Sequence, residues 1–161
     1  MNWAHAHLVL NHVPVLGTFF GLALLGYALI RRSDPLKRAA LNAFVAIALL
    51  APPVYFTGEP AEEVVEHAAG VAKDRVESHE DAALLALTAV ELLGVVAALG
   101  LYASRRARPI SAKATGAALI VALAAATLMA RAANLGGQIH HTEIRSGVQP
   151  PAPGNGADDE R

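Results

Sequence analysis

The chain has 161 residues, of which 54% are hydrophobic and 17% are charged, and its formal net charge is −1. The charged share is low for a water-soluble domain, in which about a quarter of the residues is usual, and the balanced charge argues against a nucleic-acid partner. The sequence contains no cysteine, which excludes disulfides, thiolate metal sites, Cys-ligated iron–sulfur clusters and covalent c-type haem attachment. Any bound metal must therefore use histidine or oxygen ligands.

Four apolar segments follow one another along the chain, at residues 8–30, 39–56, 82–103 and 114–135. Each is long enough, or nearly so, to cross ~30 Å of hydrocarbon as a helix. A soluble four-helix bundle would need polar outward faces, which these segments lack. We therefore predict an all-α, up-and-down bundle of four transmembrane helices in the lipid bilayer.

The charged loops predict the orientation of these spans. Basic residues cluster after the first and third segments, at Arg31, Arg32, Lys37, Arg38, Arg105, Arg106, Arg108 and Lys113. The positive-inside rule makes both loops cytoplasmic. We expect a multi-pass protein of the bacterial inner membrane, with both termini extracytoplasmic. All seven histidines stand at the opposite ends of the segments.

Prolines and glycines suggest where the helices bend or end. Pro14 is expected to kink the first span, and Pro52-Pro53 to kink the second span or end it early. Gly136-Gly137 is typical of a helix stop, and would also let a flat cofactor approach closely. Residues 57–78 are expected to form two short extracytoplasmic helices that are split at Gly70 and lie on the membrane as a lid. Their acids are expected to form a solvated face, at Glu59, Glu62, Glu63 and Glu66.

The last part of the chain has a different composition. Residues 146–161 are rich in Pro, Gly and acidic residues, and we expect a disordered tail there. The membrane domain would then comprise residues 1–145.

Candidate ligands gather at the histidine-bearing ends. A count of helical rise from the basic loops gives an outer tier with His5, His7, His79, Glu80 and His141. A deeper tier holds His12, Glu91 and Arg131. Imidazole is a good ligand for Zn, Cu, Fe and haem iron, and carboxylates either ligate the metal directly or orient its ligands.

Glu91 and Arg131 are the charged residues inside the spans, where a charge costs at least ~2.5 kcal/mol. One interpretation is a buried ion pair that fixes the packing of two helices. The alternative is functional, with Glu91 carrying a proton or Arg131 holding an anionic group such as a haem propionate.

Three runs of sequence carry a family resemblance: "HAHLVLNHVPVLG", "HEDAALLAL" and "ARAANLGGQIHHTEIR". They resemble a widespread group of uncharacterised bacterial four-span membrane proteins. That group is similar to a domain of unknown function often encountered beside Rieske-type iron–sulfur or cytochrome components. The resemblance covers residues 1 to about 145 and implies a membrane protein with a redox role.

The leading hypothesis is a b-type haem protein that passes electrons to a redox partner at the extracytoplasmic face. Its favoured axial ligands are His12 and His79, with His141 and His7 as substitutes and Arg131 or Arg145 pairing with the propionates. The second hypothesis is a non-haem Zn, Cu or Fe site built from His5, His7, His79, Glu80 and His141.

The third hypothesis is an accessory subunit without a cofactor, and the fourth is transport of protons or small molecules through Glu91. No nucleophilic triad, phosphate loop or zinc-protease motif is present. The sequence leaves enzymatic activity, the redox partner and the oligomeric state open.

Overall fold

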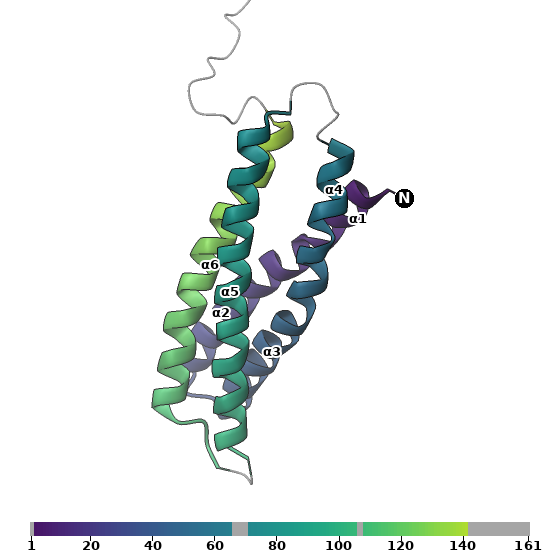
Figure 1. Ribbon diagram of the computed structural model, residues 1–161. Helices are drawn as coiled ribbons and strands as arrows, with labels where there is room; N and C mark the ends of the chain where they lie inside the picture. The colour runs from purple at the N-terminus through teal and green to yellow at the C-terminus, as the bar shows by residue number, and fades with distance from the viewer. Residues whose placement is uncertain (1, 66–70, 106–107, 142–161) are drawn as a thin grey trace, which may run out of the picture.

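A computed structural model describes residues 2–65, 71–105 and 108–141. Over these residues the protein is all-helical, as predicted (Figure 1), with helices α1 (Trp3–Leu10), α2 (His12–Ile30), α3 (Asp34–Phe56), α4 (Gly58–Val65), α5 (Lys73–Ala103) and α6 (Ala112–His140). Four helical stretches are long and apolar enough to cross a membrane: Trp3–Ile30, Asp34–Val64, Lys73–Ala103 and Ala112–Ile139. The chain thus has the helices of a multi-pass membrane protein. The predicted tail lies outside the described residues.

Pro14 accounts for the break between α1 and α2. A proline has no N–H and its ring clashes with the carbonyl four residues earlier, which here belongs to Leu10, the last residue of α1. The hydroxyl of Thr18 donates to the Pro14 carbonyl at 2.7 Å within the buried part of α2. The first span is therefore interrupted at Asn11, close to the predicted kink.

The prolines of the second span do not end its helix, contrary to one of our two expectations. Pro52 and Pro53 lie inside α3, which continues to Phe56. Thr57 separates α3 from α4, and α4 extends α3 in nearly the same direction (Figure 1). Ala51 and Val54 in this turn are buried against the neighbouring helices, and this packing stabilises the helical path through the prolines.

The predicted pair of short surface helices is only partly found. α4 is a short helix, but it stands beside α1 instead of lying across the end of the bundle (Figure 1). Residues 73–78 are not a separate helix, because they form the first turns of α5. The expected split at Gly70 lies outside the described residues.

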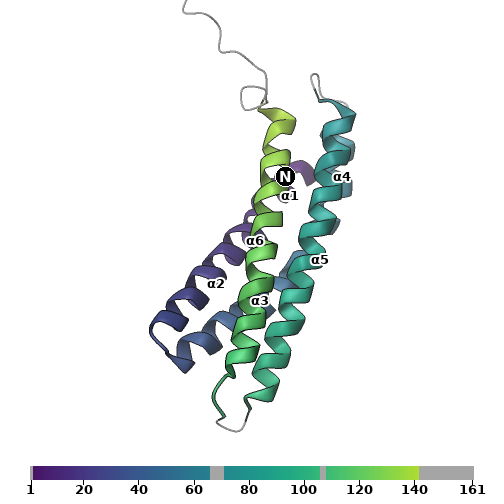
Figure 2. The ribbon, with the colours of Figure 1, turned by 90° about the vertical axis from the view of Figure 1, so that its left-hand side faces the viewer.

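Small residues let the four long helices pack closely. At Gly21, a Cβ atom would lie 2.5 Å from a ring carbon of Phe44, so only glycine lets α2 approach α3 here. Alanines fill the contact between α5 and α6, which run side by side in both views (Figures 1 and 2), and include Ala82, Ala86, Ala118 and Ala122. Such contacts are typical of helices that associate in lipid.

The outward surface of the long helices is strongly apolar. Ile30, Leu49 and Ile120 are 80%, 73% and 70% exposed, respectively. A soluble protein would bury such side chains, because exposing apolar surface to water costs about 25 cal/mol per Å². Lipid contact removes this cost, which agrees with a membrane location.

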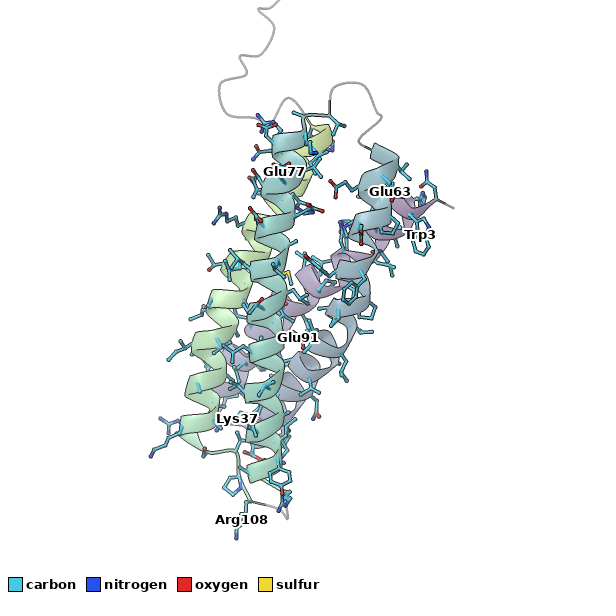
Figure 3. The ribbon with its side chains drawn as sticks, viewed as in Figure 1. Trp3, Lys37, Glu63, Glu77, Glu91 and Arg108 are labelled. Atoms are coloured by element: carbon cyan, nitrogen blue, oxygen red, sulfur yellow. The ribbon has the colours of Figure 1, made fainter. Side chains whose placement is uncertain are left out.

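The two ends of the bundle carry different side chains (Figure 3). Lys37 and Arg108 lie at one end, here called the basic end, together with the α2–α3 and α5–α6 connections. Trp3, Glu63 and Glu77 lie at the other end, here called the histidine end, and Glu91 lies between the two (Figure 3). The sequence segregates its charges along one axis, and the fold preserves that segregation.

Candidate histidine and carboxylate site

At the histidine end, two pairs of helices face each other. α1 packs on α4, and the start of α5 packs on the end of α6. In Figure 1 these two pairs diverge toward the end of the bundle. Side chains from both pairs interact across this region, so it is the place where distant parts of the sequence meet.

His7 reaches from α1 to the junction of α3 and α4. Its Nδ1 atom lies 2.8 Å from the Thr57 hydroxyl oxygen, and that hydroxyl donates its own proton to the Val54 carbonyl at 2.6 Å. Because the hydroxyl proton is already engaged, the oxygen must accept, and Nδ1 of His7 must donate. In a neutral imidazole this leaves a free lone pair on Nε2, the arrangement that metal-ligating histidines use.

His79 is held in the same way by α6. Its Nδ1 atom donates to the backbone carbonyl of Ala132 at 3.0 Å, since a carbonyl oxygen can only accept. Its ring also lies flat against Gly136, where a Cβ atom would stand 2.9 Å from the ring carbon Cε1. Nε2 of a neutral His79 is then the free nitrogen, as in His7.

Gly136-Gly137 thus differs from the predicted helix stop. α6 continues through both glycines to His140, and the glycine at 136 makes room for an imidazole. The group that lies close to Gly136 is the side chain of His79.

The two imidazoles are neighbours. His7 and His79 lie close enough for a charge on one ring to act on the other. Both side chains are partly buried, whereas His5 and His12 are exposed. The structure therefore brings together two of the predicted ligands, from α1 and α5.

The carboxyl groups of Glu62 on α4 and Glu80 on α5 lie close enough to interact with each other. Two ionised carboxylates repel, so a cation between them would stabilise the pair. Lys73 lies near enough to act on Glu62 electrostatically. Glu80 was a predicted ligand, but Glu62 was expected on a solvated face and instead faces α5.

The structure places the other predicted ligands elsewhere. The exposed ring of His12 bonds through Nδ1 to the carbonyl of Leu8 at 2.8 Å, one turn earlier in its own chain. The ring that interacts with His79 is that of His7 and not that of His12. His5 is exposed in the first turn of α1, and the exposed His141 follows the last residue of α6. Arg145 lies outside the described residues.

Glu91 and Arg131 do not form the ion pair that the sequence suggested, within the described part of the chain. Arg131 is exposed on α6. Oε1 of Glu91 is completely buried and has no hydrogen-bond partner. Arg75, on the first turns of α5, donates from its guanidinium to Gln138 Oε1 on α6 at 3.2 Å.

Three groups that contact the rings of His7 and His79 were not predicted from the sequence in this role: the Thr57 hydroxyl, the backbone at Gly136 and the Ala132 carbonyl. The hydroxyl of Thr57 follows two prolines and a helix end, which is a weak signal for a ligand-orienting role. Every residue carries a backbone carbonyl like that of Ala132, and a glycine in a helix has no single meaning, so only the packing of α5 on α6 identifies these two groups.

The donor set permits some ligands and not others. In the residues described, no three His, Asp or Glu side chains lie close enough to share one metal ion. Two imidazoles with anchored Nδ1 atoms suit a group that takes one nitrogen from each side. No protein-family model, curated protein or solved structure matches the chain.

Proposed function

We propose that the protein is an antiparallel four-span membrane protein that binds a b-type haem between His7 and His79 and transfers electrons at the extracytoplasmic face. The carrying observation is that two imidazoles from separate helices are neighbours, each with Nδ1 bonded to an oxygen acceptor and Nε2 left for a metal. This replaces His12 by His7 in the axial pair expected from the sequence.

The proposed orientation of the protein in the membrane is supported by the charges at the basic end. Arg31, Arg32, Arg105 and Arg108 flank the two connections there, and basic loops are retained in the cytoplasm. The histidine site and both termini would then be extracytoplasmic, where a soluble redox protein can reach them. A bound haem would supply a one-electron couple at this site.

The chain's own residues would position and shield that group. Thr57 and the Ala132 carbonyl hold the two rings in orientation, which also raises their basicity as ligands. Gly136 leaves space for His79. Arg75, which bonds to Gln138 between α5 and α6, would pair with a propionate in this proposal, a role the sequence suggested for Arg131 or Arg145.

The test is the absorption spectrum of the purified full-length protein, oxidised and reduced, followed by titration with haemin. We expect the spectrum of haem with two nitrogen ligands, at about one per chain. His7→Ala and His79→Ala should each abolish it. His5→Ala and His12→Ala are the matched controls and should leave it unchanged, because both rings are exposed.

A subtler variant tests the orientation of His7. Thr57→Val removes the acceptor of the Nδ1 proton and keeps the size of the side chain, and loss of such a partner weakens metal binding by about 10–100-fold. Thr88→Val is the control, since the Thr88 hydroxyl bonds only to Leu84 of its own helix. A colourless protein that takes up no haemin would refute the proposal.

A second candidate function is a non-haem metal site, which the Glu62–Glu80 pair favours. Two neighbouring carboxyl groups from separate helices could bind a divalent cation between them. Elemental analysis separates the candidates: a colourless protein with stoichiometric Zn, Cu or Fe that Glu80→Gln removes supports the metal site. A colourless and metal-free protein points to the accessory subunit.

A further inference from the structure

Glu91 is an isolated carboxyl group at mid-height of the bundle (Figure 3). Its Oε1 atom is completely buried without a hydrogen-bond partner, while the side chain as a whole is partly accessible. An unpaired buried carboxylate is among the most costly groups a membrane helix can contain. A residue retained at such cost requires an explanation that the haem proposal does not supply.

Among the residues that the structure describes, no cation pairs with this carboxylate. α3 has no charged side chain between Arg38 and Glu59, and α2 has none between His12 and Arg31. Apart from Glu91, residues 82–103 of α5 are uncharged. On α6 the charge between Lys113 and His140 is Arg131, which is exposed and is not paired with Glu91.

On α3, which packs against α5, two backbone carbonyls lack their usual hydrogen-bond donors. Pro52 and Pro53 lack N–H groups, so the carbonyls four residues earlier, at Ala48 and Leu49, lose their partners within α3. Freed carbonyls in membrane helices are satisfied by neighbouring helices, by waters or by coordinated ions.

Close packing brings the Ala48 carbonyl to the level of Glu91. Gly94, one turn further along α5, packs so tightly on α3 that an added Cβ would clash with Ala48 and lie 3.8 Å from the Phe44 carbonyl. The helices run in opposite directions, and carbonyls point toward the C-terminal end of their helix. The Ala48 carbonyl therefore points toward the layer of Pro52, and the Glu91 side chain tilts the same way, toward the N-terminal end of α5.

The Glu91 carboxylate and the freed Ala48 carbonyl are both acceptors, and Oε1 of Glu91 has no hydrogen-bond donor. We propose that the Glu91 carboxylate and the Ala48 carbonyl form an intramembrane binding site for a small monovalent cation, either a proton or Na⁺. A cation there cancels the charge of the carboxylate and satisfies the carbonyl that Pro52 frees. The site lies on the α3–α5 contact and is independent of any ligand bound by His7 and His79.

Labelling with a hydrophobic carbodiimide tests this site in the full-length protein in liposomes. The carboxyl proton moves to a carbodiimide nitrogen as the carboxyl oxygen bonds to the central carbon, and rearrangement gives a stable N-acylurea. The reagent reaches Glu91 from the lipid, because part of its side chain is accessible at the surface of the span. We expect an adduct at Glu91, found by peptide mass spectrometry, that forms faster at acidic pH.

Added Na⁺ distinguishes the two cations. Protection of Glu91 by Na⁺ at fixed pH identifies a sodium site, and labelling that is insensitive to Na⁺ identifies a proton site. Pro52→Ala restores the N–H that the Ala48 carbonyl lacks. It should therefore weaken cation binding, seen as a shift of the labelling profile to lower pH or as a loss of Na⁺ protection.

If the carbodiimide does not reach Glu91, infrared spectroscopy can still report whether the carboxyl group is protonated. The difference between the wild type and Glu91→Gln, a neutral substitution of the same shape, isolates the carboxyl band. A protonated band, or an ionised band that shifts with Na⁺, supports the site. An ionised band insensitive to Na⁺, with no adduct at any pH, overturns it.

Discussion

At the level of single residues, the histidine site depends on what lies behind each ring. His7 and His79 are oriented by one oxygen each, and these oxygens belong to Thr57 and to the Ala132 backbone. Neither partner is itself a metal ligand. Sequence alone gives the imidazoles, whereas the fold determines which nitrogen of each ring remains free.

Gly136→Ala should displace the ring of His79. The added Cβ would stand 2.9 Å from Cε1 and 3.2 Å from Nδ1 of His79, so the ring must move away and its bond to Ala132 must weaken. Overpacking of this kind costs about 1–3 kcal/mol. We expect a lower midpoint of thermal unfolding in detergent and at least about 10-fold weaker binding of any ligand held by His79.

Gly116→Ala is the matched control on the same helix, because a Cβ there meets nothing within 4 Å. It should raise helix stability by up to about 1 kcal/mol. Equal unfolding midpoints for the two variants would show that Gly136 does not support His79.

At the level of helices, the basic end is held by one arginine. The guanidinium of Arg38 on α3 bonds to Asp34 at 3.0 Å, to the Ser104 hydroxyl at 3.3 Å and to the carbonyls of Ser104 and Arg108. Asp34 in turn accepts the backbone N–H of Ile110 at 2.7 Å. The α5–α6 connection is thereby attached to the start of α3.

Arg38→Met should loosen that connection. It keeps the aliphatic stem but leaves the Ser104 and Arg108 carbonyls without this donor, at a cost of about 1–3 kcal/mol. We expect faster proteolysis between α5 and α6 and a lower unfolding midpoint. Arg31→Met removes the same charge from an exposed position, so a similar loss in that variant would contradict the proposed role.

The helices themselves were predictable and their junctions were not. Hydrophobic length identified all four spans, because lipid selects for it directly. The expected pairing of His12 with His79 treated the first span as one rod. The break at Asn11 gives α1 its own packing on α4, and this brings His7 to the site. Counting the helical rise from the basic loops places His7 and His79 in one tier, whereas His12 lies deeper.

Some side chains were misjudged because their environment is tertiary. Glu62 was expected in water, but α4 stands upright and turns it toward Glu80 on α5. Pro52 and Pro53 were expected to kink the second span or to end it early, and α3 continues through them to Phe56. Local propensity could not anticipate either outcome, since each depends on a neighbouring helix.

At the level of the whole molecule, chemistry and charge are divided between two ends. The histidine and carboxylate side chains lie at one end and the arginine connections at the other, with Glu91 between them (Figure 3). In the proposed function, electrons are exchanged at the histidine end while the basic end fixes the orientation of the protein in the membrane. That proposal therefore depends on which end faces the cytoplasm.

Single cysteines can determine that orientation without background, since the chain has no native cysteine. Ser78→Cys at the histidine end and Pro109→Cys at the basic end are both exposed and leave the loop charges unchanged. Because basic loops stay inside, we expect a membrane-impermeant maleimide to label Ser78→Cys in spheroplasts at once. Pro109→Cys should react only after the membrane is permeabilised. The reverse pattern would place the histidine site in the cytoplasm, and labelling of both positions in intact spheroplasts would show that they are not on opposite sides of the membrane.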